Sequence, residues 1–162
     1  MLAITSYGVF VALHVIAVVG AYGLPLAYPL MLPYLRRAHP RSMPGVHDVQ
    51  HRLNKILTGP GTLLVLGAGI YLASKADAWD EPWVGVGFTA IIIIALAGGW
   101  IVGTTAKLAE MAQADVAAAG PGGDVAWSPE YEALYHRYER VELFLGLVVM
   151  VTIFCMAAKP GS

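Results

Sequence analysis

Charged residues are scarce in this chain of 162 residues, at 13%, whereas apolar residues make up 57% and the mean hydropathy is +0.64. Soluble domains usually carry about a quarter charged residues, so water is not the main solvent for this surface. The net charge of −1 excludes the basic footprint of a nucleic-acid-binding protein. The single cysteine, Cys155, excludes a disulfide within the chain and a thiolate metal cluster.

The positively charged leader of a signal peptide is also missing, because residues 1–6 contain no Lys or Arg. We therefore expect the first apolar run to be a retained helix. A spanning helix needs about 20 apolar residues, and four stretches meet this need, at about 6–26, 56–74, 83–106 and 141–158. The sequence predicts an all-α polytopic membrane protein in which residues 1–162 form one four-transmembrane-helix bundle.

Three prolines follow the first predicted span: Pro25, Pro29 and Pro33. Because proline lacks a backbone donor, we expect this end of the span to be kinked.

Small residues recur at four-residue spacing within the predicted spans, which lets helices approach closely in lipid. The pairs are Gly8 with Ala12, Ala17 with Ala21, Gly69 with Ala73, and Gly99 with Gly103. Such pairs are equally consistent with packing inside a bundle, in a homo-oligomer or against a membrane-protein partner.

Basic residues divide unevenly between the loops. Eight lie in the first and third loops: Arg36, Arg37, Arg41, Arg52, Lys55, Lys107, Arg137 and Arg140. Only Lys75 and Lys159 lie on the other side. Because Lys and Arg accumulate in cytoplasmic loops, we expect both termini to lie outside, in a multi-pass protein of a bacterial inner membrane.

The third loop is too long for a simple turn. Residues 107–119 are rich in alanine and continue the third helix, until Gly120-Pro121-Gly122-Gly123 breaks it. Ser128 is a candidate N-cap, followed by Pro129 at the first helical position. The sequence thus predicts a cytoplasmic helical extension between spans three and four.

His14 is the candidate chemical centre. It lies about 12 Å into the first span at 1.5 Å per residue, where an ionisable side chain is costly and should face the bundle. A neutral imidazole there can bind haem iron or copper, relay a proton, or hydrogen-bond a carbonyl. Met150 of the fourth span has a similar depth, which makes it a candidate second ligand of haem b.

His47 and His51 lie four residues apart, on one face of a helix, a spacing that suits a metal ion. The surrounding arginines suit anionic lipid head groups or a haem propionate, and a solvated basic collar explains them equally. Glu142, at the inner end of the fourth span, is expected to pair with Arg52 or Lys55.

Several short motifs carry a resemblance to known families. They are Leu13-His14, the arginines after it, His51-Arg52 leading into Gly59-Pro60-Gly61, and Met156-Ala157-Ala158-Lys159-Pro160. The chain resembles a family of small bacterial four-helix predicted integral membrane proteins. More distantly, it is similar to the copper-resistance D domain and to the haem-b protoporphyrinogen oxidases, which implies that His14 is a haem ligand. The oxidases also use a basic residue within a later span, and this chain has none there.

Two hypotheses follow. The first is a small redox protein that binds haem b through His14, with the porphyrin edge toward the basic inner side. The second is a non-enzymatic accessory or structural membrane protein that packs within a larger complex or a homo-oligomer.

Overall fold

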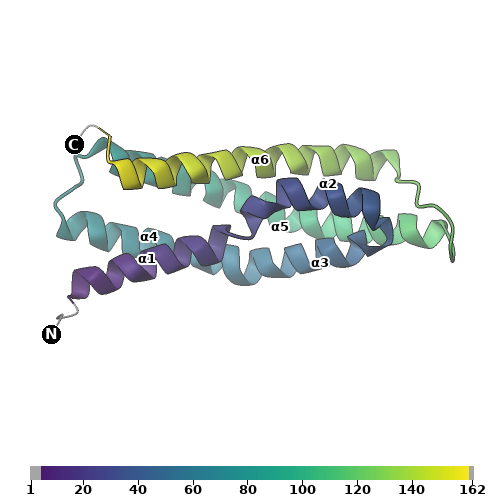
Figure 1. Cartoon of the computed structure of the whole chain (residues 1–162), viewed down its shortest axis with the longest axis horizontal. Helices are drawn as coiled ribbons and strands as arrows, with labels where there is room; N and C mark the ends of the chain where they lie inside the picture. The colour runs from purple at the N-terminus through teal and green to yellow at the C-terminus, as the bar shows by residue number, and fades with distance from the viewer. Residues whose placement is uncertain (1–4, 161–162) are drawn as a thin grey trace.

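The computed structural model describes residues 5–160, and within this range the chain forms helices and connections but no strand. The α-helices are α1 (Ser6–Tyr22), α2 (Tyr28–Ala38), α3 (Met43–Leu53), α4 (Gly59–Lys75), α5 (Pro82–Ala118) and α6 (Pro129–Ala158). Two 3₁₀ turns, η1 (Pro25–Ala27) and η2 (Pro40–Ser42), and one π-helical turn, η3 (Asn54–Thr58), join the first four. Figure 1 shows one elongated bundle with both ends of the described chain at the same end.

Three helical segments are long and apolar enough to cross a membrane: Pro40–Lys75, Pro82–Ala118 and Pro129–Ala158. They contain the second, third and fourth predicted spans. The segments Ser6–Tyr22 and Pro25–Ala38 meet the same criterion together, as one span bent by 42°. The bend lies at Pro25, so the kink predicted from the prolines is confirmed.

Pro60 explains the π-helical turn η3. A proline at this position cannot donate to the carbonyl of Ile56, so the regular ladder is interrupted. The Gly59 backbone N–H instead bonds to the Asn54 carbonyl, five residues back, and the helix continues into α4. The first loop is thus almost entirely helical, whereas the sequence predicted a basic loop between spans.

The predicted extension between spans three and four is confirmed. The 37 residues of α5 make a helix about 55 Å long, well beyond a hydrocarbon core of about 30 Å. α5 ends at Ala118, and α6 begins after Ser128, whose side chain accepts from the Tyr131 backbone N–H. We call residues 28–58 and 101–140 the polar half of the bundle, and residues 6–27, 59–100 and 141–158 the apolar half.

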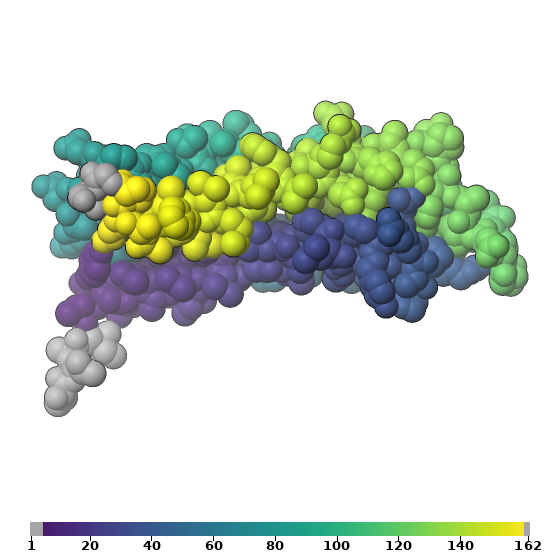
Figure 2. Space-filling view, turned by 45° about the horizontal axis from the view of Figure 1, so that its top comes forward, coloured from purple at the N-terminus to yellow at the C-terminus, as the bar shows by residue number. Residues whose placement is uncertain are grey.

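The two halves are packed differently. The largest fully buried side chains of the described residues all lie in the polar half: Tyr28, Leu32, Met43, His47, Gln50, Thr105, Leu108, Tyr131, Tyr135 and Tyr138. There α3 packs against α5, and α5 packs against α6. α6 also lies along α2, as Figures 1 and 2 both show.

In the apolar half the helices associate mainly as two pairs, α1 with α4 and α5 with α6, while α4 and α5 contact each other much less. The first pair is in very close contact, because a Cβ atom added at Gly61 would lie 2.7 Å from the Cβ of Ala21. Ala21 belongs to one of the predicted small-residue pairs. The looser contact between the two pairs leaves room for a cavity.

Candidate functional site

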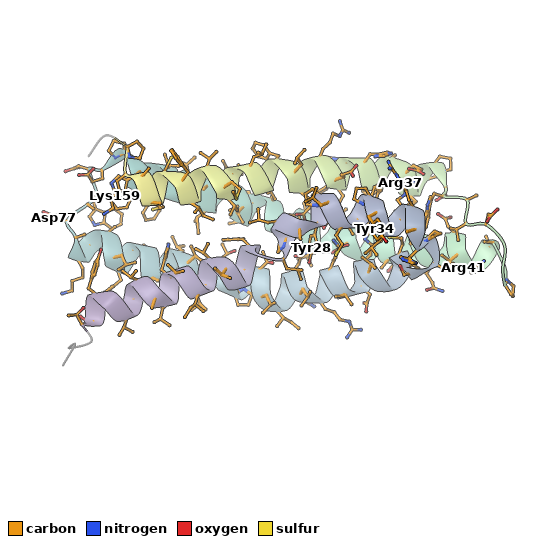
Figure 3. All side chains as sticks on the ribbon, in the orientation of Figure 1. Tyr28, Tyr34, Arg37, Arg41, Asp77 and Lys159 are labelled. Carbon is orange, nitrogen blue, oxygen red and sulfur yellow. The ribbon has the colours of Figure 1, made fainter. Side chains whose placement is uncertain are left out.

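A cavity of about 790 Å³ lies in the apolar half, between the α1/α4 pair and the α5/α6 pair. This volume falls within the range of about 300–1,000 Å³ that is typical of small-molecule sites. Its wall is mostly aliphatic and aromatic and is contributed by all four helices, for example by Val65, Ile94 and Val149. Asp77 and Lys159 lie where the wall reaches the end of the bundle, far from Arg37 and Arg41 (Figure 3).

His14 lies in the wall of this cavity, half-buried, as its cost in a membrane predicts. Its Nδ1 atom is 3.1 Å from the carbonyl oxygen of Val65 on α4. A carbonyl only accepts, so Nδ1 carries the proton and Nε2 keeps its lone pair in the neutral ring. Within residues 5–160, Nε2 has no hydrogen-bond partner. Gly69 lies against the ring: a Cβ there would lie 3.5 Å from Cε1 of His14, an ordinary van der Waals distance.

Met150 does not join His14. Its side chain is 56% exposed on the outer surface of α6 and contributes nothing to the cavity wall. The residues of α6 that reach the cavity are on another face: Val149, Thr152, Ile153, Met156 and Ala157. Thr152, at a depth similar to that of His14, already donates its hydroxyl to the Val148 carbonyl. The structure therefore offers His14 no second protein ligand at its own depth.

The polar half holds a second group of functional side chains, buried between α3 and α6. The His47 Nε2 atom is 3.0 Å from the Tyr131 hydroxyl, and its Nδ1 is 2.9 Å from the Gln50 Oε1. The Gln50 amide nitrogen donates to the Tyr138 hydroxyl at 3.1 Å, and Tyr138 is hydrogen-bonded to Glu142. We call these five residues the buried polar chain.

The direction of these hydrogen bonds follows from the chemistry of their atoms. The Gln50 oxygen only accepts, so His47 carries its proton on Nδ1 and accepts from Tyr131 at Nε2. Tyr138 accepts from Gln50, which leaves its own proton for the Glu142 carboxyl. Every donor in the chain therefore points toward Glu142.

Burial determines the protonation states of His47 and Tyr131, which both lie outside the predicted spans. It lowers the pKa of His47 from its ordinary value of 6.5 to about 4, against the opposing effect of the hydrogen bond to Gln50. Burial also raises the pKa of Tyr131, although the nearby Arg36 guanidinium opposes that change. His47 is therefore neutral and Tyr131 a hydroxyl at neutral pH.

The predicted metal pair is not assembled. His47 bonds to Gln50 and Tyr131, whereas His51 places its Nδ1 3.0 Å from the carbonyl of Val102 on α5. In the part of the chain that the structure describes, no three His, Cys, Asp or Glu side chains are grouped as a metal site would require. The predicted pairing of Glu142 with Arg52 or Lys55 is also wrong, because Arg52 pairs with Asp48 at 2.9 Å and Glu142 bonds to Tyr138.

No family model, curated protein or solved structure matches this chain. The resemblance to the small bacterial membrane families stays a prediction, and the two sites are interpreted from their own residues.

Sequence reasoning missed the buried polar chain and an aromatic cluster beside it. The Arg36 guanidinium carbon lies 4.7 Å from the centre of the Tyr135 ring, and Arg36 forms an ion pair with Glu132. The only sequence signal was the density of tyrosines between residues 131 and 138, which resembles a membrane-interface belt. Burial of these tyrosines, together with Tyr28, makes them core residues of the polar half.

Proposed function

We propose that the chain is a four-span protein of a bacterial cytoplasmic membrane, with the polar half in the cytoplasm and both termini outside. The apolar half holds α1, α4 and parts of α5 and α6; α4, α5 and α6 belong to helical segments long and apolar enough to cross a membrane, and α1 meets that criterion together with Pro25–Ala38. The uneven division of Lys and Arg supports the orientation. A reporter active only in the cytoplasm, fused after Ser162, should give no signal, whereas the same reporter inserted at Gly122 should give a strong one. The reverse pattern would invert the topology.

Within that membrane, we propose that the protein is a small redox protein that binds haem b in the cavity through Nε2 of His14. The observation that carries this proposal is the geometry of His14. A ring that donates Nδ1–H to a backbone carbonyl has the tautomer and orientation that haem ligation needs. Bound there, haem would supply one-electron transfer through its iron.

The residues around the cavity suit a large apolar cofactor. The aliphatic wall would exclude water, and His14 presents its ring within that wall. None of the arginines of the polar half lines the wall of the cavity. The charged groups that do line it, Asp77, Glu81 and Lys159, lie at the opposite end. Of these three, Lys159 carries the positive charge that a propionate would need, whereas Asp77 and Glu81 would repel it.

The protein purified from cells supplied with haem tests this proposal. We expect a sharp visible absorption band that is lost in His14→Ala. His51→Ala is the matched control. The Nδ1 atom of His51 lies 3.0 Å from a backbone carbonyl of a neighbouring helix, much as that of His14 lies 3.1 Å from one, but His51 lines no part of the cavity. Since no second side chain of residues 5–160 is free to join His14 at its depth, carbon monoxide should bind the ferrous form and shift the band. A colourless wild-type protein, or a band that survives His14→Ala, would refute haem ligation by His14.

The second candidate is a non-enzymatic accessory protein, and one observation favours it. Gly99 and Gly103 lie exposed on α5, and within the described range a Cβ at either would meet no atom within 4 Å. This predicted small-residue pair is not used inside the bundle, so it is available to another helix that packs against α5 near the boundary of the two halves. A colourless protein that migrates as a homo-oligomer in detergent, and as a monomer after Gly99→Leu, would support this function instead.

A further inference from the structure

Glu142 occupies an unusual place for a carboxyl group. It is 5% exposed, at the boundary between the polar and apolar halves, and it belongs to the predicted fourth span. Among residues 5–160, no Lys, Arg or His side chain forms an ion pair with it. A buried carboxylate without a cation is costly, and carboxyl groups inside membrane spans commonly handle protons or ions.

The groups around Glu142 offer hydrogen bonds but no compensating charge. Tyr28 from α2 and Tyr138 from α6 are the titratable groups within its electrostatic range. Residues 94–105 of α5 contain no charged side chain. On α3 and η3 the buried polar side chains apart from His47 are the neutral amides of Gln50 and Asn54, whereas Arg52 and Lys55 are exposed.

Among the described residues, the hydrogen bonds between α3 and α6 end one turn before Glu142. α3 and α6 run in the same direction along the bundle (Figure 1). His47 bonds to Tyr131, and Gln50 bonds to Tyr138. Glu142 follows Tyr138 by one turn on α6, so it lies at the end of this series of hydrogen bonds.

The Tyr138 hydroxyl is the donor to this carboxyl. Two further buried donors, the Tyr28 hydroxyl and the Asn54 amide nitrogen, have no hydrogen-bond partner among the described residues, so neither donates to Glu142. The Tyr138 donor stabilises the ionised carboxylate, whereas burial without a cation stabilises the neutral carboxyl. The proton affinity of Glu142 is set by these two opposing effects.

We propose that the Glu142 carboxyl is a proton-binding site at which the protein reversibly takes up one proton. Binding forms an O–H bond on a carboxylate oxygen and requires no electron transfer or second reactant. The buried polar chain responds to this event, because its donors are all directed toward the ionised group. When Glu142 becomes neutral, Tyr138 loses its charged acceptor, and the ordering effect on Gln50 and His47 weakens. The site depends on neither haem nor His14.

Infrared spectroscopy of the full chain in lipid, titrated with acid, tests the proposal. We expect a protonated-carboxyl carbonyl band that grows as the pH falls, shifts in D₂O, and is missing in Glu142→Gln. Glu139→Gln is the matched control, because it removes a carboxyl of the same helix that bonds instead to the surface residue His136 at 3.4 Å. That variant should keep the band.

A second variant keeps the proposal testable if Glu142→Gln does not fold. Tyr138→Phe removes the hydroxyl donor to Glu142 and leaves the carboxyl in place, so the midpoint of the band should move to higher pH. The proposal is overturned if the band survives Glu142→Gln, if the wild-type protein shows it at every pH, or if the wild-type protein shows it at none. It is also overturned if the midpoint is unchanged in Tyr138→Phe.

Discussion

Replacing His47 with glutamine should change how the stability of the protein depends on pH. His47 is fully buried in the polar half and lies outside the apolar stretch of its helix. An unfolded chain binds a proton at this imidazole below pH 6.5, whereas the folded protein resists it until about pH 4. The unfolded state therefore binds more protons between these values, and the folded state loses stability as the pH falls through them.

The size of this loss follows from the two pKa values. The difference between 6.5 and about 4, at 1.36 kcal/mol for each pH unit, is worth about 3 kcal/mol. Above pH 6.5 His47 contributes no pH dependence, because it is neutral in both states. Below pH 6.5 the wild-type free energy of unfolding should fall with a slope that His47→Gln lacks.

Reversible unfolding in mixed detergent micelles, followed by circular dichroism from pH 7 to pH 4, measures this difference. At pH 7 the variant should be less stable by about 1–3 kcal/mol, because it disrupts the hydrogen bonds to Gln50 and Tyr131. The gap should then close as the pH falls. His136→Gln, at an exposed histidine of α6, is the matched control for the loss of a histidine side chain. Parallel curves for wild type and His47→Gln would refute the reasoning.

Two further predictions concern the backbone. Gly61→Ala should lower the free energy of unfolding by about 1–3 kcal/mol, because the new Cβ would lie 2.7 Å from that of Ala21 and force α1 and α4 apart. At Gly67 a new Cβ would meet no atom within 4 Å among the described residues, so Gly67→Ala should leave the free energy of unfolding unchanged or raise it by up to about 1 kcal/mol. A denaturant titration of both variants measures the difference. Equal effects of the two substitutions would contradict the close contact between α1 and α4. Limited proteolysis should cut first within residues 120–123, between α5 and α6, and cleavage spread evenly over residues 107–140 would contradict the helical hairpin.

Local chemistry made several features predictable. Span length follows from hydropathy, and the hairpin follows from its glycines and from the Ser128 N-cap. The bend at Pro25 follows from a missing backbone donor. Each of these depends on residues adjacent in the sequence, so no knowledge of the packing was needed.

The side chains that meet across the bundle could not be predicted in the same way. Depth along a helix follows from residue number, and on that basis Met150 matches His14. The rotation of α6 decides which face meets the cavity, and it turns Met150 outward while Val149 and Thr152 face in. His47 and Tyr131 are 84 residues apart in sequence, so their contact likewise depends on how α3 and α6 are placed relative to each other.

The unequal packing of the two halves has a mechanical consequence. A set of rods is stiffest where it is clamped, and here the main clamp is the polar half with its buried aromatic side chains. At the other end the α1/α4 and α5/α6 pairs are tied together by residues 76–81, which join α4 to α5, and by the buried cluster of Ala73, Ala78 and Val84. The stretch between these two ties, where the cavity lies and where α4 and α5 contact each other little, is therefore the part of the bundle that deforms most easily.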